Sequence, residues 1–258
     1  SLVNYIGVGT GSNNVVVGRY AAARMTSGHT NTIIGHQAMS EITSATQNTA
    51  VGKNALANTS TGGSNVAVGA YAGSSQTGAV ENTYVGYAAG QGQNGVTGNS
   101  NTAVGNYSQK DRSGGSGNTS VGHYALGSDV TAGWSASDNT AVGTFTGMRI
   151  TSGGLNTFIG YDAGSRITVG GNNTLIGNGA GLSGSPSNQL TSESNRICLG
   201  NNSVSHLYCK ISTITTSDKR DKTNFGDISY GLDFVNQLKP TSFEFKKDGL
   251  RDTKETDG

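Results

Sequence analysis

The stretch NTIIG at Asn31–Gly35 returns along most of the chain and decides its fold. The pattern Asn-Thr-x-(Val/Ile)-Gly recurs, for example, as NTAVG at Asn48–Gly52 and as NTYVG at Asn82–Gly86. The glycines that end the successive copies are Gly18, Gly35, Gly52, Gly69, Gly86, Gly105, Gly122, Gly143, Gly160, Gly177 and Gly200. Seven of their ten spacings are 17 residues, and the others are 19, 21 and 23. A fixed period with small additions is typical of stacked repeats and argues against Gly/Ser/Asn-rich disorder.

The columns of this repeat predict the cross-section of one coil. The residue before the glycine is Val or Ile in ten of eleven copies, which favours a strand with this column on its buried face. The third residue after the glycine is small, as at Ala38 and Ala55, which indicates a tight inner corner. The glycine suits a bend with positive φ or a close approach of two backbones. The Asn column predicts a ladder of side-chain amides that bond from coil to coil.

Several coils contain a further short apolar segment, which predicts a second strand. Examples are RMTSG at Arg24–Gly28, EITSA at Glu41–Ala45, RITSG at Arg149–Gly153 and RITVG at Arg166–Gly170. Two strands and two turns in about 17 residues fit one coil of a β-solenoid, and strand steps of ~4.8 Å would give a rod roughly 50 Å long. A single coil cannot bury its apolar column alone, so we expect an all-β, oligomeric repeat solenoid over residues 1–210.

The repeat region resembles the YadA-like head of trimeric autotransporter adhesins. Those repeats also end in Asn-x-x-(Ile/Val)-Gly followed by a small residue, and the resemblance spans residues 14–200. It implies a homotrimeric β-solenoid, either a left-handed β-roll or a triangular β-helix, in which three chains pack around a threefold axis. Because the 17-residue period is longer than that of the family, an interleaved triple-stranded β-helix is the alternative.

Charge and composition exclude several classes of function and mark a domain boundary. The net charge of +1 gives no reason to expect nucleic acid or an acidic membrane as a partner. No apolar run approaches 18 residues and no signal peptide is visible, so we expect no membrane insertion. The first 210 residues contain 16 charged side chains and the last 48 contain 17. We therefore predict a linker at 211–216 and a different domain at 217–258.

The second domain opens with SDKRDK at Ser217–Lys222, followed by GLDFVNQLKPTSFEF from Gly231. Taken alone, SDKRDK is typical of a solvated charged turn. With the segment that follows, it resembles the start of the endosialidase-type intramolecular chaperone, the S74 peptidase family. That family opens with Ser-Asp-x-Arg-x-Lys and continues with a helix of the form Gly-Leu-(Asp/Glu)-x-(Ile/Val)-x-x-Leu-x-Pro. The matching segment corresponds to about the first third of such an α+β domain.

The S74 resemblance implies a single self-cleavage of the Thr216–Ser217 bond. Ser217 would be the nucleophile and Lys222 its base. A lysine can act as a base only when its pKa is lowered, and the positive charges of Lys219 and Arg220 could contribute to this. Such a reaction matures the chain once and is not catalysis on an external substrate.

Together the two resemblances imply a phage tail fibre that is part of the virion and attaches to a host surface polysaccharide, similar to the L-shaped side tail fibres of coliphages. One alternative is a tailspike depolymerase, which needs paired carboxylates. The acidic residues of the repeats are scattered, although Asp138 could meet Asp129 or Asp162 across coils. The other alternative is a bacterial trimeric adhesin, whose membrane anchor would stand where the chaperone-like segment lies.

Candidate receptor contacts lie in the additions to the 17-residue coil, because loops on a rigid scaffold often carry recognition. The only tryptophan, Trp134, lies in one addition with Asp129 and Asp138 nearby. An exposed ring could stack on a sugar while the carboxylates bind its hydroxyls; the alternative is a clamp between chains. Aromatic residues two positions after the glycine predict a ladder that packs the trimer, namely Tyr20, Tyr71, Tyr107, Tyr124 and Phe145.

The cysteines and histidines do not suggest a cofactor. Cys198 and Cys209 are the only cysteines, and two thiols 11 residues apart are more typical of packing than of a metal or redox site. The four histidines lie in separate repeats without the spacing of metal ligands. We therefore predict neither a metal nor a cofactor.

Overall fold

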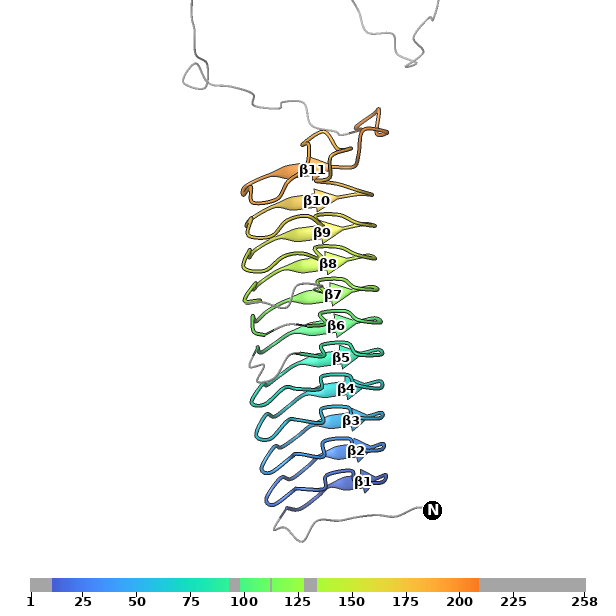
Figure 1. Ribbon diagram of the computed structural model, residues 1–258, viewed down its shortest axis with the longest axis vertical. Coiled ribbons are helices and arrows are strands. Elements are labelled where there is room, and N and C mark those ends of the chain that lie inside the picture. The colour runs from blue at the N-terminus through green and yellow to red at the C-terminus, as the bar shows by residue number, and fades with distance from the viewer. Residues whose placement is uncertain (1–10, 93–97, 112, 128–133, 209–258) are drawn as a thin grey trace, which may run out of the picture. The chain divides into compact units, whose positions relative to one another are not determined.

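The computed structural model describes residues 11–92, 98–111, 113–127 and 134–208. Within them, eleven three-residue strands form one parallel sheet whose strands follow the chain order (Figure 1). The strands are β1 (Val15–Val17), β2 (Thr32–Ile34), β3 (Thr49–Val51), β4 (Val66–Val68), β5 (Thr83–Val85), β6 (Thr102–Val104), β7 (Thr119–Val121), β8 (Thr140–Val142), β9 (Thr157–Ile159), β10 (Thr174–Ile176) and β11 (Ile197–Leu199). The predicted all-β solenoid with 17-residue coils is confirmed. The described residues form no helix, and so none that could cross a membrane.

Consecutive strands of the same chain pair in register along the whole sheet. Thr32 pairs with Thr49, for example, and Ile33 pairs with Ala50. Each chain thus stacks its own coils, which favours separate rolls over the interleaved triple-stranded arrangement. The chain divides into two compact units, Ser1–Leu207 and Tyr208–Gly258. The predicted boundaries at residues 210 and 217 lie outside the described residues.

The middle residue of each strand points into the core, and its two neighbours point outward. Ile33, Phe158 and Leu175 are fully buried, whereas Ile34 and Ile176 are 38% and 39% exposed. The prediction that the Val/Ile column before the glycine is buried is therefore wrong. Side chains alternate between the two faces of a strand, so this column and the middle column cannot both point inward.

The core is narrow, and it is filled by side chains of complementary size. The ring of Phe158 lies against Gly147 and Gly164, where an added methyl group would approach ring carbons to 2.7 Å and 2.5 Å. Tyr84 lies in the same way between Gly73 and Gly90. The two inward aromatic rings are thus accommodated because the turn after their own strand and the turn after the preceding strand both carry glycine.

The repeat glycines stand where two backbones approach closely and where φ is positive, as predicted. Gly52 has φ +137°, and a Cβ built on it would lie 2.5 Å from the carbonyl oxygen of Gly69 in the next coil. The small residues three positions later, such as Ala38 and Ala55, are fully buried at the inner corner. Both predictions for this corner are confirmed.

The predicted asparagine ladder is present and runs from Asn14 to Asn173. At a typical rung, the backbone N–H of Asn48 donates to Oδ1 of Asn31 at 2.9 Å, and its side-chain Nδ2 donates to the same oxygen at 3.1 Å. Nδ2 also donates to the carbonyl of Gly62 at 3.0 Å, which ties the amide to a third coil. The last coil has Arg196 in this column, and its backbone N–H donates to Asn173.

The predicted second strand is wrong for the described residues, which contain only one strand in each coil. The backbone N–H groups of Thr26 and Ser27 both donate to the carbonyl of Thr43, at 3.0 Å and 2.9 Å. Two adjacent donors that share one acceptor cannot continue a β-ladder, in which neighbouring groups point to opposite sides. The apolar residues of these segments are nevertheless buried, as at Ile42 and Ile150.

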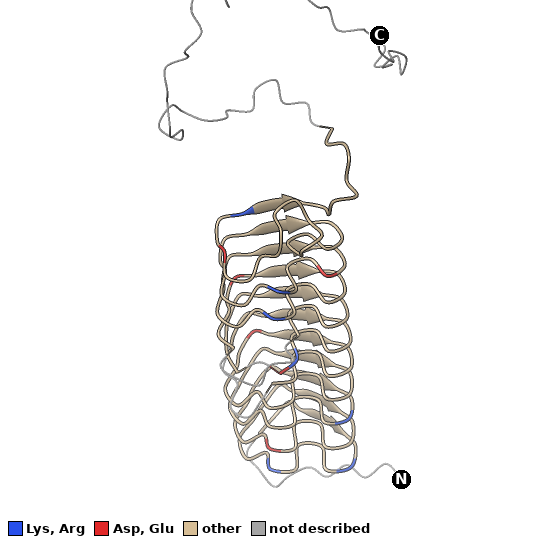
Figure 2. Ribbon diagram, turned by 45° about the horizontal axis from the view of Figure 1, so that its top comes forward, with Lys and Arg blue, Asp and Glu red and all other residues tan. Residues whose placement is uncertain are grey.

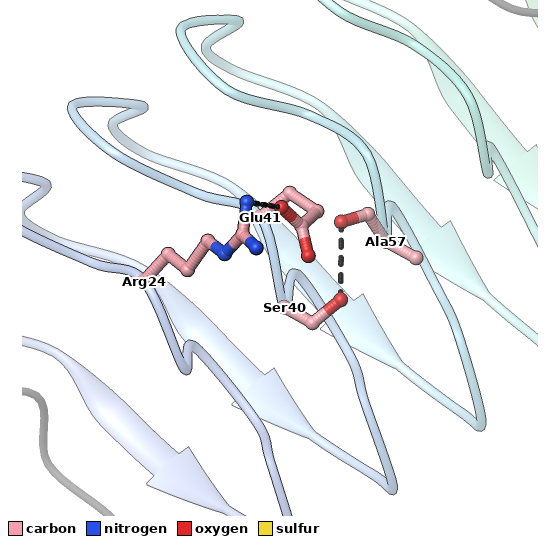
Figure 3. Close-up of polar contacts among 4 residues, drawn as sticks. All are labelled: Arg24, Ser40, Glu41 and Ala57. Atoms are coloured by element: carbon pink, nitrogen blue, oxygen red, sulfur yellow. Dashed lines mark hydrogen bonds and ion pairs between the residues drawn. The ribbon is translucent and has the colours of Figure 1, made fainter.

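Between neighbouring coils the solvent side of this segment carries polar contacts (Figure 3). Arg24 forms an ion pair with Glu41 at 2.6 Å, and the hydroxyl of Ser40 donates to the carbonyl of Ala57 at 3.4 Å. Because the side chains of the ion pair are 71% and 39% exposed, the pair contributes little to stability.

The close backbone approach at the glycine column predicts that two glycine substitutions differ strongly in their effect on stability. Gly52→Ala should lower the free energy of unfolding by about 3 kcal/mol, because the methyl group meets a carbonyl at a φ that L residues rarely adopt. Gly78→Ala is the matched control, since its Cβ would lie in ordinary contact, 3.7 Å from the hydroxyl oxygen of Thr61. Denaturant unfolding measures both variants. Equal stabilities would contradict the role given to the column.

Candidate functional site

The outward sheet face consists of the first and third residues of strands β1 to β11. Its members are Thr, Val and Ile, together with Leu199. None of the strands β1 to β11 contains a charged residue, and the Lys, Arg, Asp and Glu residues of the described part lie outside these strands (Figure 2). The side chains are partly exposed along the rod, for example 36% at Val85 and 39% at Val121. This face is a long, uncharged and mainly β-branched surface.

An aromatic ladder lies beside the carboxyl ends of the strands. Its rings are Tyr71, Tyr87, Tyr107, His123, Tyr124, Phe145 and Tyr161. Ring centroids of successive members are 6.0 Å apart for Tyr71 and Tyr87, and 5.3 Å apart for Tyr87 and Tyr107. Tyr20 stands apart from this run and contacts His36 instead.

The sequence predicted only part of this ladder. Tyr87, His123 and Tyr161 lie one residue after the repeat glycine, not two, and were missed. Residues at both positions reach the same row because they occupy one tight corner. The rings contact one another within one chain, and whether they also pack between chains stays a prediction.

The three additions to the regular coil occur at the same place in the repeat and define the loop edge, residues 91–100, 127–138 and 182–194. Each begins after the buried inner corner, as at Ala180, and ends before the ladder column, as at Arg196. Insertions at one position of a stacked repeat emerge along one side of the rod. Residues 93–97 and 128–133 lie outside the described residues, whereas the third addition is described in full.

Internal contacts hold the third addition in place. The hydroxyl of buried Ser185 donates to the carbonyl of Leu182 at 2.7 Å. The hydroxyl also accepts the N–H of Gly181 at 3.2 Å, and Leu190 fills the core. The addition is therefore anchored by its own polar and apolar groups.

At the end of this addition the carboxylate of Glu193 binds two backbone N–H groups. These are the N–H of Thr191 at 2.6 Å and that of Ser192 at 3.0 Å. The hydrogen bond from Thr191, followed by those from the other backbone groups, lowers the pKa of Glu193. Glu193 is thus an ionised group that caps the turn and is poorly suited to donate a proton.

The exposed side chains of the third addition are mainly polar. Ser183, Asn188 and Gln189 are exposed, together with Pro186. Hydroxyl and amide groups both donate and accept hydrogen bonds, as the hydroxyls of a sugar do. This segment of the loop edge is therefore chemically suited to a neutral, hydroxyl-rich ligand.

Trp134 does not have the exposed ring that its position in an addition predicted. It is 2% exposed and belongs to a core cluster with Leu126 and Ile150. A Cβ on Gly115 would lie 2.5 Å from the Trp134 ring, so this glycine makes room for the ring. The hydroxyl of Ser113 donates to the backbone carbonyl of Trp134 at 3.1 Å. Gly115 gave no sequence signal of this burial, because glycine recurs at the same repeat position, as at Gly62 and Gly153.

The two aspartates predicted beside Trp134 have different outcomes. Asp138 is exposed, and its backbone N–H donates to the carbonyl of Ser116 at 2.9 Å. Asp129 lies outside the described residues. Asp138 precedes β8 whereas Asp162 follows β9, so these two carboxylates stand at opposite ends of the strands and on different coils. The predicted possibility that Asp138 and Asp162 meet is therefore wrong.

Some of the other predicted site residues lie outside the described part of the chain. The self-cleavage residues Thr216, Ser217 and Lys222 are outside it, as is Cys209. Cys198 is 4% exposed and occupies the inward position of β11, which suits a packing role. In the described ranges there is no cluster of three or more His, Cys, Asp or Glu that could hold a metal ion.

Comparison with protein families assigns the C-terminal segment. Residues 217–257 match the family described as Chaperone of endosialidase, Peptidase S74. The chain joins a β-solenoid to an S74 chaperone segment. This combination fits a phage tail fibre that carries the start of such a chaperone. Comparisons with curated proteins and with solved structures gave no match.

The burial of Trp134 predicts that its substitution lowers the stability of the rod. Trp134→Ala should lower the free energy of unfolding by about 3–5 kcal/mol, because it leaves a cavity in a narrow core. Val169→Ala, at a side chain that is 51% exposed, is the control and should cost less than about 1 kcal/mol. Thermal or denaturant unfolding compares the two variants. A melting temperature unchanged by Trp134→Ala would contradict the burial.

Proposed function

We propose that the chain is the receptor-binding rod of a phage tail fibre, part of the virion, that attaches to a polysaccharide on the host cell surface. The S74 segment and the β-solenoid together indicate a protein of the tail fibre or tailspike type. The anchored third addition, with its exposed hydroxyl and amide groups, supports recognition of a neutral glycan.

The loop edge supports recognition because it combines a rigid base with variable segments. The coils beneath the additions are fixed by the asparagine ladder, so loop residues such as Asn188 and Gln189 project from a preorganised surface. Exposed Asp138 can also accept hydrogen bonds from sugar hydroxyls. Trp134 takes no part, since its ring is buried.

The geometry gives less support to a tailspike depolymerase. Glycan hydrolysis commonly needs a protonated and an ionised carboxyl group on either side of the scissile bond. Asp138 and Asp162 stand at opposite ends of the strands, and Glu193 is held ionised by backbone N–H groups. Binding without cleavage is therefore the function that we propose.

Assembly and maturation complete the proposal. The rod would be a homotrimer, because each coil buries only a thin core and leaves its sheet face exposed. The S74 match implies a chaperone that cleaves itself from the fibre, with Ser217 as nucleophile and Lys222 as base. The proposed reaction breaks the Thr216–Ser217 bond once.

Recognition by the third addition can be tested with exposed polar residues. The double variant Ser183→Ala/Gln189→Ala should reduce adsorption of the rod to host cells or to their purified polysaccharide by at least tenfold. Its melting temperature should stay unchanged, because both side chains are exposed. Ser44→Ala/Gln47→Ala is the matched control, with the same residue types exposed on a coil of regular length. Equal adsorption of the two double variants would remove the third addition from the binding site.

Self-cleavage can be tested in a chain that carries the complete chaperone. Ser217→Ala and Lys222→Ala should each leave the chain uncut, because one removes the nucleophile and the other its base. Lys254→Ala, at a lysine outside the Ser217–Lys222 motif, is the control and should still be cleaved. Gel electrophoresis with mass spectrometry of the products measures cleavage. Processing of Ser217→Ala at the normal rate would contradict the proposed dyad.

A further inference from the structure

We infer that the corner row binds a linear acidic polysaccharide lengthwise along the rod. The corner row consists of the residues that directly follow the repeat glycines, one in each of the eleven coils. The inference rests on the attachment to a surface polysaccharide proposed above. It adds a second contact surface beside the third addition and names the charge of the ligand that this surface takes.

Variation at an exposed position is the first argument. The residue before each repeat glycine is Val or Ile in ten of eleven coils, whereas the corner row contains Arg, His, Lys, Ala, Tyr, Asn and Thr. Its members Lys53, Tyr87 and His123 are exposed. The fold needs a fixed residue at the glycine but none directly after it. Side chains of the row can therefore suit a ligand without altering the coil.

The charge of the row is the second argument. It contains the cations Arg19 and Lys53 and no Asp or Glu. Within the described ranges, neither cation forms an ion pair. The guanidinium carbon of Arg19 lies 4.6 Å from the centroid of the Tyr20 ring. Nζ of Lys53 lies 5.5 Å from the centroid of the Tyr71 ring. Cations that are held over rings and lack a carboxylate partner suit the carboxylates of an acidic sugar.

The exposed rings of the row are the third argument. Tyr87 and Tyr161 are 46% and 53% exposed, although both contact other rings of the aromatic ladder. Tyr87 contacts Tyr71 on one neighbouring coil and Tyr107 on the other, at 6.0 Å and 5.3 Å between centroids. These contacts hold the ring in place and leave about half of it open. A ring fixed in this way can stack on a sugar at little cost in conformational entropy.

The geometry of the row favours a linear polymer. The strands pair in register, so successive members stand one coil apart at steps of ~4.8 Å. The three additions begin after the inner corner and do not interrupt the row. A chain that lies parallel to the rod can contact several members at once, and linked weak contacts give a much higher overall affinity than one contact alone.

The low density of positive charge favours a polysaccharide over a nucleic acid. Proteins that bind single-stranded nucleic acid follow its backbone with a positively charged groove. Only two of the eleven members of the row are Lys or Arg, and the net charge of the chain is +1. Such a row matches a polymer in which neutral sugars alternate with acidic ones.

Binding of the assembled rod to immobilised polygalacturonate, alginate and hyaluronan tests the inference, with dextran as the neutral probe. The wild type should bind at least one acidic polymer about tenfold more tightly than dextran, and added salt should weaken this binding. Arg19→Gln/Lys53→Gln should weaken it by about tenfold. Arg149→Gln/Arg166→Gln removes the same charge outside the row and should bind as the wild type does. Binding to none of the acidic polymers, or equal effects of the two double variants, would overturn the inference.

The role of the rings can be tested with the same acidic polymers. Tyr87→Ser/Tyr161→Ser should weaken binding by about tenfold, whereas Tyr87→Phe/Tyr161→Phe keeps both rings and should retain it. Light scattering should give the wild-type mass for every variant. A reduced mass would place the row in a contact between chains and overturn the inference. Tighter binding to polydeoxythymidine than to the acidic polysaccharides would overturn the assigned ligand.

The outcome for the row is distinguishable from that for the proposed function. Adsorption to host cells is measured separately, with the variants of the third addition. A rod that binds acidic polymers through the row but does not adsorb to host cells would contradict the proposed function and leave the row in place. A rod that adsorbs to host cells but binds none of the acidic polymers would overturn the row alone.

Discussion

The ladder of buried asparagines is the interaction on which the rest of the structure depends. Each rung joins three coils, as Asn118 does by donating to Asn101 at 3.1 Å and to the carbonyl of Ala136 at 3.0 Å. An unsatisfied buried amide costs about 1–3 kcal/mol, so a slip of one residue would be penalised at every rung. The ladder therefore fixes the register of the parallel sheet. Once the register is fixed, every repeat position becomes a column along the rod.

The period, the glycine bend, the alanine corner and the amide ladder could all be predicted from the sequence, because each needs one residue type at a fixed spacing. The inside and outside of the strand could not, since two adjacent columns are both apolar. The more regular column, Val or Ile before the glycine, predicts the core but faces outward. The inward column is in fact the variable one, from Ala50 to Phe158, because each inward residue must match the size of its neighbours across a narrow core.

The candidate site was predictable to a smaller extent, for related reasons. The additions to the coil predicted correctly that the loop edge consists of irregular segments. They did not predict the direction in which a side chain within an addition points. Trp134 turns inward because Gly115 leaves space on the neighbouring coil. This is a contact between two turns, and no column of the repeat predicts it. The aromatic ladder is built from two positions after the glycine, so one sequence column contains only part of it. The proposed roles of Ser217 and Lys222 come from the S74 resemblance alone.

In a rod built in this way, each outer surface is formed by a different segment of the repeat. The outward sheet face belongs to the strand, which is bounded by the asparagine ladder on one side and by the glycine column on the other. The additions follow the inner corner and rejoin the coil before the next ladder residue, so they do not alter the strand. Coils with 17, 19, 21 and 23 residues between glycines accordingly contribute strands to one continuous sheet. Loop residues can therefore change in number and type while the sheet face keeps its regular spacing.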